Sequence, residues 1–185
     1  MNKIIVADNF DDGKDYNNIV FIFACPGRLE RNNECVCRGC TGGNLSRLLN
    51  DLCDNYPKLF PSRDRYDYRI LNSSEVCHYK ALTGDTLPSN EEILDESNLK
   101  RIASKLKNGD LAICFGVQAN VVANTIKNQG DIDFEIIKAD HLSMSNLNTN
   151  KKYIVTKEKE EERTWERIKQ ACADVYKWLE EKYND

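Results

Sequence analysis

The sequence predicts an α/β domain, a three-layer α/β/α fold around a central, mostly parallel four-stranded sheet. Two observations lead to this prediction. Apolar strand-like runs alternate with segments of helical spacing along the chain, which is the pattern of a parallel sheet with helices between its strands. The first run, residues 18–25, is almost continuously apolar, as expected for a strand covered on both faces. No repeat or linker interrupts the pattern, so residues 1–185 are predicted to form a single domain.

Four strands are expected, each bounded by polar or small residues. Their ranges are 18–25, 67–71, 110–115 and 134–138. The first stops at Pro26 and Gly27, and the third stops at Gly116, because proline and glycine interrupt regular structure. A polar, cysteine-containing loop is expected after the first strand.

Helices are expected between these strands. Residues 45–52 carry leucines at helical spacing, with Thr41 or Asn44 available as N-cap. A second helix is expected to begin at Ser89 or Asn90 and to run to about residue 107, and a third covers residues 117–127. A final helix is predicted to dock on the core through an apolar stripe made of Trp165, Ile168, Cys172, Val175 and Leu179.

Composition limits the classes of function. The formal net charge of −4 argues against a uniformly basic nucleic-acid coat, but not against a local basic rim. No apolar run approaches the roughly 20 residues that a membrane span needs. The first eight residues are too short and too soon charged for a signal peptide. We therefore expect a cytoplasmic protein, monomeric, with no membrane partner.

The eight cysteines are interpreted as reduced thiols rather than disulfides. Cys37 and Cys40 form a Cys-x-x-Cys pair, but the second pair that zinc usually requires is missing. The remaining cysteines are mostly single and lie in apolar runs, where cysteine behaves as a small hydrophobic residue. We expect no metal, no cofactor and no catalytic thiol.

Three polar segments follow predicted strands, at residues 24–30, 72–74 and 141–145. The carboxyl ends of parallel strands meet at one edge of a sheet, and ligands bind in the crevice outside that edge. The sequence therefore predicts one composite site built from these segments.

Several motifs in this chain resemble those of the uracil-DNA glycosylase superfamily, and most closely its shorter microbial branches. They are FACPGRLE, GCTGGNLSRLL, ILNSSEVCHYKALTGDTLPSNEEI and LAICFGVQANVVA, followed by HLSMS where the family has a His-Pro segment. The resemblance spans roughly residues 19–146. It implies an enzyme that flips a base out of DNA and hydrolyses the bond between base and sugar, without a cofactor.

The resemblance also implies roles for individual residues. His141 would donate a hydrogen bond to the departing base, and the Asn72 amide, which both donates and accepts, would read the pairing edge of the base. From the residues alone, a satisfied loop histidine and a turn asparagine remain possible at these two positions. His78 is expected at the surface or at the DNA rim. The residues expected to contact DNA phosphates are Thr41, Gly42, Ser143, Ser145, Arg28 and Arg38.

Two residues of the expected base pocket depart from the family pattern. Ala24, which precedes Cys25 in the pocket, stands where the family has a polar residue that activates water, and Glu30 is the nearest substitute. Cys37 stands where the family has a phenylalanine that stacks on the base. The smaller side chain enlarges the pocket. We therefore expect a bulky modified pyrimidine as substrate, such as the glucosylated hydroxymethylcytosine of phage DNA, excised in anti-phage defence.

Other interpretations stay open at this point. The chain could be a uracil-DNA glycosylase of base-excision repair, although Ala24 and Cys37 speak against it. It could also be a catalytically dead relative that binds unusual bases or DNA ends as a sensor, for which Ala24 is the best reason. A cysteine-based metal or redox module would show stoichiometric zinc or iron in purified protein.

Overall fold

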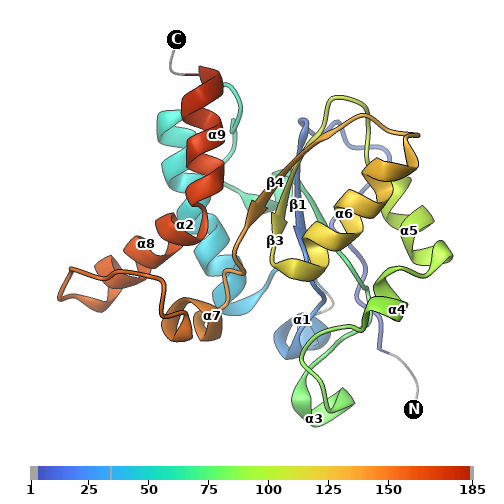
Figure 1. Cartoon of the computed structure of the whole chain (residues 1–185), viewed down its shortest axis with the longest axis horizontal. Coiled ribbons are helices and arrows are strands. Elements are labelled where there is room, and N and C mark those ends of the chain that lie inside the picture. Colours follow the sequence, from blue (N-terminus) through green and yellow to red (C-terminus); the bar gives the residue numbers. More distant parts are fainter. Residues whose placement is uncertain (1–3, 34, 184–185) are drawn as a thin grey trace.

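A computed structural model describes residues 4–33 and 35–183 (Figure 1). Within them, a four-stranded parallel sheet has helices on both faces, so the predicted three-layer α/β/α fold is confirmed. The strands are β1 (Ile19–Phe23), β2 (Arg69–Asn72), β3 (Leu111–Phe115) and β4 (Glu135–Ala139). They lie in the order β2-β1-β3-β4, and each coincides with a predicted strand.

The residues of β1 alternate between two hydrophobic cores. Ile19, Phe21 and Phe23 face one core, whereas Val20 and Ile22 face the other. All five are at most 4% exposed, which explains why the run is apolar throughout instead of alternating with polar residues.

The first face of the sheet is covered by four helices, seen on the left of Figure 1. They are α2 (Gly39–Asn55), α7 (Met144–Thr149), α8 (Glu160–Ala171) and α9 (Ala173–Tyr183). The second face is covered by α4 (Asn90–Ile93), α5 (Glu96–Ala103) and α6 (Val117–Gln129). Among the helices of the described part of the chain, none has the length and apolar character needed to cross a membrane.

Three short elements lie in the connections: α1 (Arg28–Asn33), the 3₁₀ turn η1 (Arg65–Asp67) and α3 (Lys80–Thr83). The sequence predicted an irregular loop in place of α1. The Glu30 carboxylate accepts a hydrogen bond from the Gly27 N–H at 3.1 Å, and a glutamate that reaches back to the residue before a helix stabilises its first turn. This local bond explains a helix that hydrophobic spacing cannot reveal.

The predicted N-cap of α2 is wrong. Thr41 and Asn44 both lie inside α2, which begins after Arg38. Glycines disfavour helices, so local propensity does not indicate a helix across the Gly-rich stretch. In the structure Gly42 is required within the helix, because a Cβ atom there would lie 1.9 Å from the Cys37 carbonyl oxygen.

Two other helix predictions are corrected. Ser89 caps α4 as predicted, but the chain turns after Ile93 and Asp95 caps a separate helix, α5, that ends at Ala103 instead of residue 107. The last helix is divided at Cys172 into α8 and α9. Its apolar stripe does dock on the core, with Trp165 partly buried and the other members buried: Ile168, Cys172, Val175 and Leu179.

A buried ion pair fixes the amino edge of the sheet. Arg69, the first residue of β2, donates two hydrogen bonds, of 2.7 and 2.6 Å, to the carboxylate of Asp110, which precedes β3. The side chains are 1% and 0% exposed. Because β1 lies between β2 and β3, this pair links the two strands that flank β1. Removing one partner of such a pair leaves an uncompensated charge in the interior.

Residues 4–9 run antiparallel along the free edge of β2. Asn9 and Ile70 exchange backbone hydrogen bonds of 2.9 and 3.2 Å, and the Val6 N–H donates to the Glu75 carbonyl at 2.9 Å. The segment covers a strand edge that would otherwise be open to other chains. It also places Asp8 beside the end of β2.

Candidate functional site

A cavity of about 520 Å³ lies at the carboxyl edge of the sheet. This volume is within the range of about 300–1,000 Å³ that small-molecule sites occupy. It brings together nine of the residues singled out from the sequence: Ala24, Cys25, Glu30, Cys37, Thr41, Asn72, His141, Ser143 and Ser145. Arg28, Arg38 and Gly42 do not line it. The predicted convergence of three strand ends is therefore present.

The strand order explains why the cavity forms here. The chain leaves β1 toward α2 on one face and leaves β3 toward α6 on the other face. Neighbouring strands whose connections diverge in this way open a crevice between them. Phe23, at the end of β1, lines the cavity and stacks on Phe115 of β3, with ring centroids 4.7 Å apart.

Asn72 is the last residue of β2 and is only 3% exposed. Neither atom of its side-chain amide has a hydrogen-bond partner among the residues described, so it does not close a turn on its own backbone. Because Asn72 lines the cavity and its amide makes no bond within the described part of the fold, the amide is available to a ligand. A pyrimidine edge offers the donors and acceptors that this amide matches.

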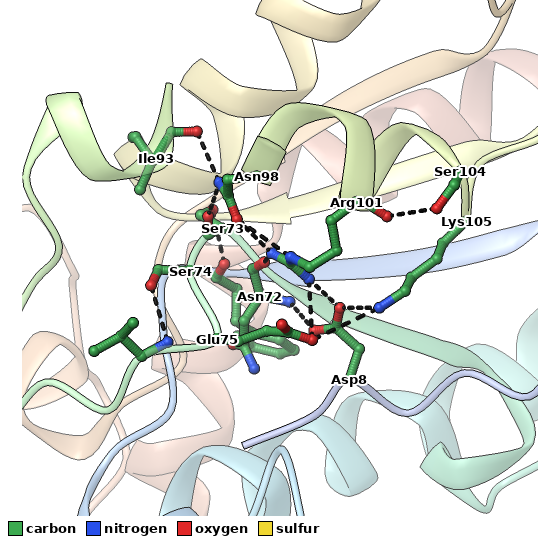
Figure 2. A network of polar contacts seen from close by, with 12 residues as sticks. Asp8, Asn72, Ser73, Ser74, Glu75, Ile93, Asn98, Arg101, Ser104 and Lys105 are labelled. Carbon is green, nitrogen blue, oxygen red and sulfur yellow. Dashed lines mark hydrogen bonds and ion pairs between the residues drawn. The ribbon is translucent and has the colours of Figure 1, made fainter. Parts of the chain in front are cut away.

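The backbone of Asn72 is held by a polar network at the end of β2 (Figure 2). Its N–H donates to Asp8 Oδ1 at 2.8 Å, and its carbonyl accepts from Arg101 at 2.7 Å. The Asp8 carboxylate is 0% exposed and is paired with both Arg101 and Lys105. Glu75 lies 3.5 Å from Arg101 and 3.7 Å from Lys105, and so adds a second carboxylate to the network.

His141 follows β4 and presents one ring nitrogen for binding. Its Nδ1 accepts a hydrogen bond from the Ser143 N–H at 3.1 Å, so the neutral ring carries its proton on Nε2. Among the residues described, Nε2 has no partner. Burial lowers the pKa of His141 from its ordinary value of 6.5, which keeps the ring neutral at pH 7. The cavity therefore contains a neutral N–H donor.

The loop that carries His141 is fixed from two sides. The Asn146 side chain donates to the His141 carbonyl at 2.8 Å, and the Asn44 side chain of α2 donates to the Leu142 carbonyl at 2.8 Å. The Tyr153 hydroxyl donates a hydrogen bond of 2.6 Å to the carboxylate of Asp140, the residue that precedes His141. These bonds preorganise the imidazole, because its backbone cannot shift without breaking them.

Glu30 lines the cavity, but both of its carboxylate oxygens accept backbone hydrogen bonds. Oε2 accepts from Gly27 and Oε1 accepts from Arg38, each at 3.1 Å. The carboxylate thus closes the turn around α1. Because both oxygens are engaged in this turn, the water-activating role of Glu30 stays a prediction that the geometry does not favour.

The thiols in the wall are small neutral groups. Burial raises the pKa of Cys25 and of Cys37 to about 12, so neither is a thiolate at pH 7. Cys37 adopts a left-handed backbone, with φ of 55°, where its carbonyl meets Gly42. Gly42 is therefore explained by this close approach without a phosphate contact. Within residues 4–33 and 35–183, no group of three or more His, Cys, Asp or Glu side chains is placed to hold a metal ion.

The candidates for phosphate contact divide into two groups. Thr41 and Ser145 line the cavity, and so does Ser143, although its hydroxyl already caps α7 by accepting from the Asn146 N–H at 3.3 Å. Arg28 and Arg38 are exposed outside the cavity, and the Arg38 guanidinium lies over the Tyr66 ring.

His78 is not an exposed surface residue, and its expected place at the DNA rim stays a prediction. Its side chain is only 10% exposed and lines the cavity, and its Nε2 lies 3.0 Å from Glu92 Oε1. The same carboxylate oxygen accepts a hydrogen bond from the Ser74 hydroxyl. Nothing in the sequence signals this pair, because Glu92 belongs to α4 and meets His78 only through the path of the connecting loop.

Comparisons with known proteins leave the family of this chain open, because no protein-family model and no curated protein matches it. The resemblance to glycosylases therefore rests on the sequence motifs alone. The chemistry of the site is a donor at His141 and an unpartnered amide at Asn72, both facing one cavity.

Proposed function

We propose that this chain is a DNA glycosylase that binds a flipped pyrimidine-type base and hydrolyses its N-glycosidic bond. The observation that carries the proposal is the pairing of two free polar groups in one cavity. These groups are the unpartnered amide of Asn72 and the Nε2–H of His141. The amide would read the pairing edge of the base, and the imidazole would donate to it.

The chemistry needs a donor of this kind. As the bond between C1′ and the base nitrogen breaks, its electron pair leaves with the base and negative charge develops on the base oxygen. A neutral N–H fixed in a water-poor cavity stabilises that charge, and removing one such donor costs about 10²- to 10³-fold in rate. Burial lowers the pKa of His141, which favours the neutral form that this role requires.

The size of the cavity supports a substrate larger than uracil. Its volume is about 520 Å³, and Ala24 and Cys37 form part of the wall where a larger side chain would reduce the space. We propose a pyrimidine with a bulky substituent, such as the glucosylated hydroxymethylcytosine of phage DNA, and a role in anti-phage defence. Arg28 and Arg38, which are exposed beside the cavity, would contribute contacts to DNA phosphates.

A panel of DNA substrates tests the proposal. Duplexes and single strands that contain glucosylated hydroxymethylcytosine, hydroxymethylcytosine, cytosine or uracil are incubated with the protein and then treated with alkali, and released bases are identified by mass spectrometry. We expect cleavage and free modified base from the glucosylated DNA, and a 10²- to 10³-fold slower reaction with His141→Ala. Release of uracil alone would reject the bulky substrate. Tight binding of modified DNA without any abasic site would instead identify a sensor.

A further inference from the structure

The connection between β2 and α4 returns to the cavity and forms one side of its wall. His78, Thr86 and Leu87 belong to this connection, and all three line the cavity. The His78 side chain is only 10% exposed, whereas Thr86 and Leu87 are exposed, which places these two residues at the mouth. The roles proposed for Asn72 and His141 leave this side of the cavity without a function.

This side of the cavity is joined to the end of β1. The Cys25 thiol donates to the Thr86 carbonyl at 3.8 Å, and the His78 N–H donates to the Pro26 carbonyl at 3.0 Å. The His78 ring is fixed because its Nε2 lies 3.0 Å from Glu92 Oε1. Its Nδ1 is buried, so the ring contributes its shape to the wall and not a free nitrogen.

The strand order determines which way a bound base faces. His141 follows β4 and Asn72 ends β2, and these are the two outer strands of the sheet. With the sugar at the mouth of the cavity, the C2 oxygen beside the breaking bond lies toward His141, which donates to it. C5 is at the opposite corner of a pyrimidine ring from C2. A substituent on C5 therefore points away from His141, toward the connection that follows β2.

We propose that four residues on that side receive the group attached to C5 and select one that is hydroxylated and sugar-like. This inference rests on the proposed glycosylase function and deepens it, because it assigns the choice of substrate to residues outside the base-reading pair. We call these residues the substituent wall: Cys25, His78, Thr86 and Leu87.

The substituent wall offers two kinds of contact. The Thr86 hydroxyl has no hydrogen-bond partner among the described residues, and a hydroxyl both donates and accepts. Leu87 is an apolar side chain that is 46% exposed, and covering apolar surface is favourable. A sugar ring presents hydroxyl groups at its edge and C–H groups on its faces, so it matches both. The wall contains no carboxylate, lysine or arginine, which favours an uncharged group.

Binding measurements on defined DNA test the inference. The probes are duplexes with a single glucosylated hydroxymethylcytosine or a single hydroxymethylcytosine, and every protein carries His141→Ala so that turnover is slow. We expect this parent protein to bind the glucosylated DNA at least about 10-fold more tightly. Thr86→Val, which removes the hydroxyl and keeps the size, should reduce the preference about 3- to 10-fold. Leu87→Ala should reduce it about 10-fold.

Thr149→Val is the matched control. Thr149 lines the same cavity from α7, on the side of His141, and its hydroxyl donates to the Ser145 carbonyl at 2.7 Å. This variant should leave the preference for glucosylated DNA unchanged. Thermal unfolding checks that all variants are folded, which the exposure of Thr86 and Leu87 favours.

Equal dissociation constants for the two DNAs in the parent protein would overturn the inference. A preference that survives in both Thr86→Val and Leu87→Ala would overturn it too, and so would an equal loss in Thr149→Val. These failures leave the glycosylase proposal intact, because that proposal is tested by base release from the panel of substrates. A wild type that releases no base from any DNA in the panel would overturn both.

Discussion

His78 and His141 line the same cavity, and each has one ring nitrogen engaged by a neighbouring group. His141 uses Nδ1 to accept from the Ser143 N–H, so its Nε2–H is available as a donor. His78 Nε2 lies 3.0 Å from Glu92 Oε1, and its Nδ1 is buried without a partner among the described residues. Of the two imidazoles, His141 is therefore the one that presents a ring nitrogen to the cavity.

The protonation of His141 predicts a pH effect on stability. Because burial lowers its pKa in the folded state, the unfolded chain binds more protons between that lowered value and 6.5. The stabilising contribution is complete above 6.5 and is lost as the pH falls through this window. We expect the free energy of unfolding of wild type to fall relative to His141→Gln between pH 7.5 and pH 5.5, measured by urea denaturation. An equal difference at both pH values would contradict this assignment.

The Asn72 amide is predicted to add nothing to the stability of the fold. Asn72→Leu replaces an amide that makes no hydrogen bond within the described residues by an apolar side chain of similar size, so we expect the protein to be about as stable as wild type, with base release or DNA binding lost. Asn44→Leu is the matched control, because the Asn44 amide donates to the Leu142 carbonyl at 2.8 Å. It should lose about 1–3 kcal/mol in urea denaturation. Similar losses in both variants would show that the Asn72 amide is structural.

Replacing either of two adjacent glycines in α2 with alanine is predicted to change the stability of the protein, in opposite directions for the two positions. A Cβ at Gly42 would lie 1.9 Å from the Cys37 carbonyl oxygen, so Gly42→Ala must displace the turn that carries Cys37. We expect it to destabilise the protein by at least about 2 kcal/mol and to alter the cavity. Gly43→Ala meets nothing within 4 Å and should stabilise the helix by about 0.5–1 kcal/mol. Thermal unfolding of both variants checks the contrast, which equal effects would disprove.

Cys37 and Cys40 are predicted to react at different rates with an alkylating reagent. Cys40 is exposed, whereas burial raises the pKa of Cys37 to about 12. At pH 8 only about 10⁻⁴ of Cys37 is thiolate, so brief treatment of native protein with iodoacetamide should modify Cys40 and spare Cys37. Peptide mass spectrometry with and without denaturant measures the difference. Rapid modification of both, or stoichiometric zinc in purified protein, would revive the metal or redox interpretation.

The strands and the meeting of their ends were predictable because they depend on patterns within short segments. The apolar run through Phe21 indicates a strand by itself, and parallel strands bring Asn72 and His141 to one edge. The pairing of His78 with Glu92 was not predictable, since it depends on how a loop returns to the sheet. The start of α2 was missed for a related reason: the need for Gly42 arises from the Cys37 carbonyl, which local helix propensity does not register.

The carboxylate of Asp8 connects the beginning of the chain to the end of β2, where it accepts from the Asn72 N–H and pairs with Arg101 and Lys105 (Figure 2). Trimming the leading residues for crystallisation, or fusing a tag that pulls them off the sheet, would therefore disturb the backbone that holds the Asn72 amide, which we propose reads the base. A shortened version that folds but does not discriminate between bases would report on the missing segment, and not on the pocket itself.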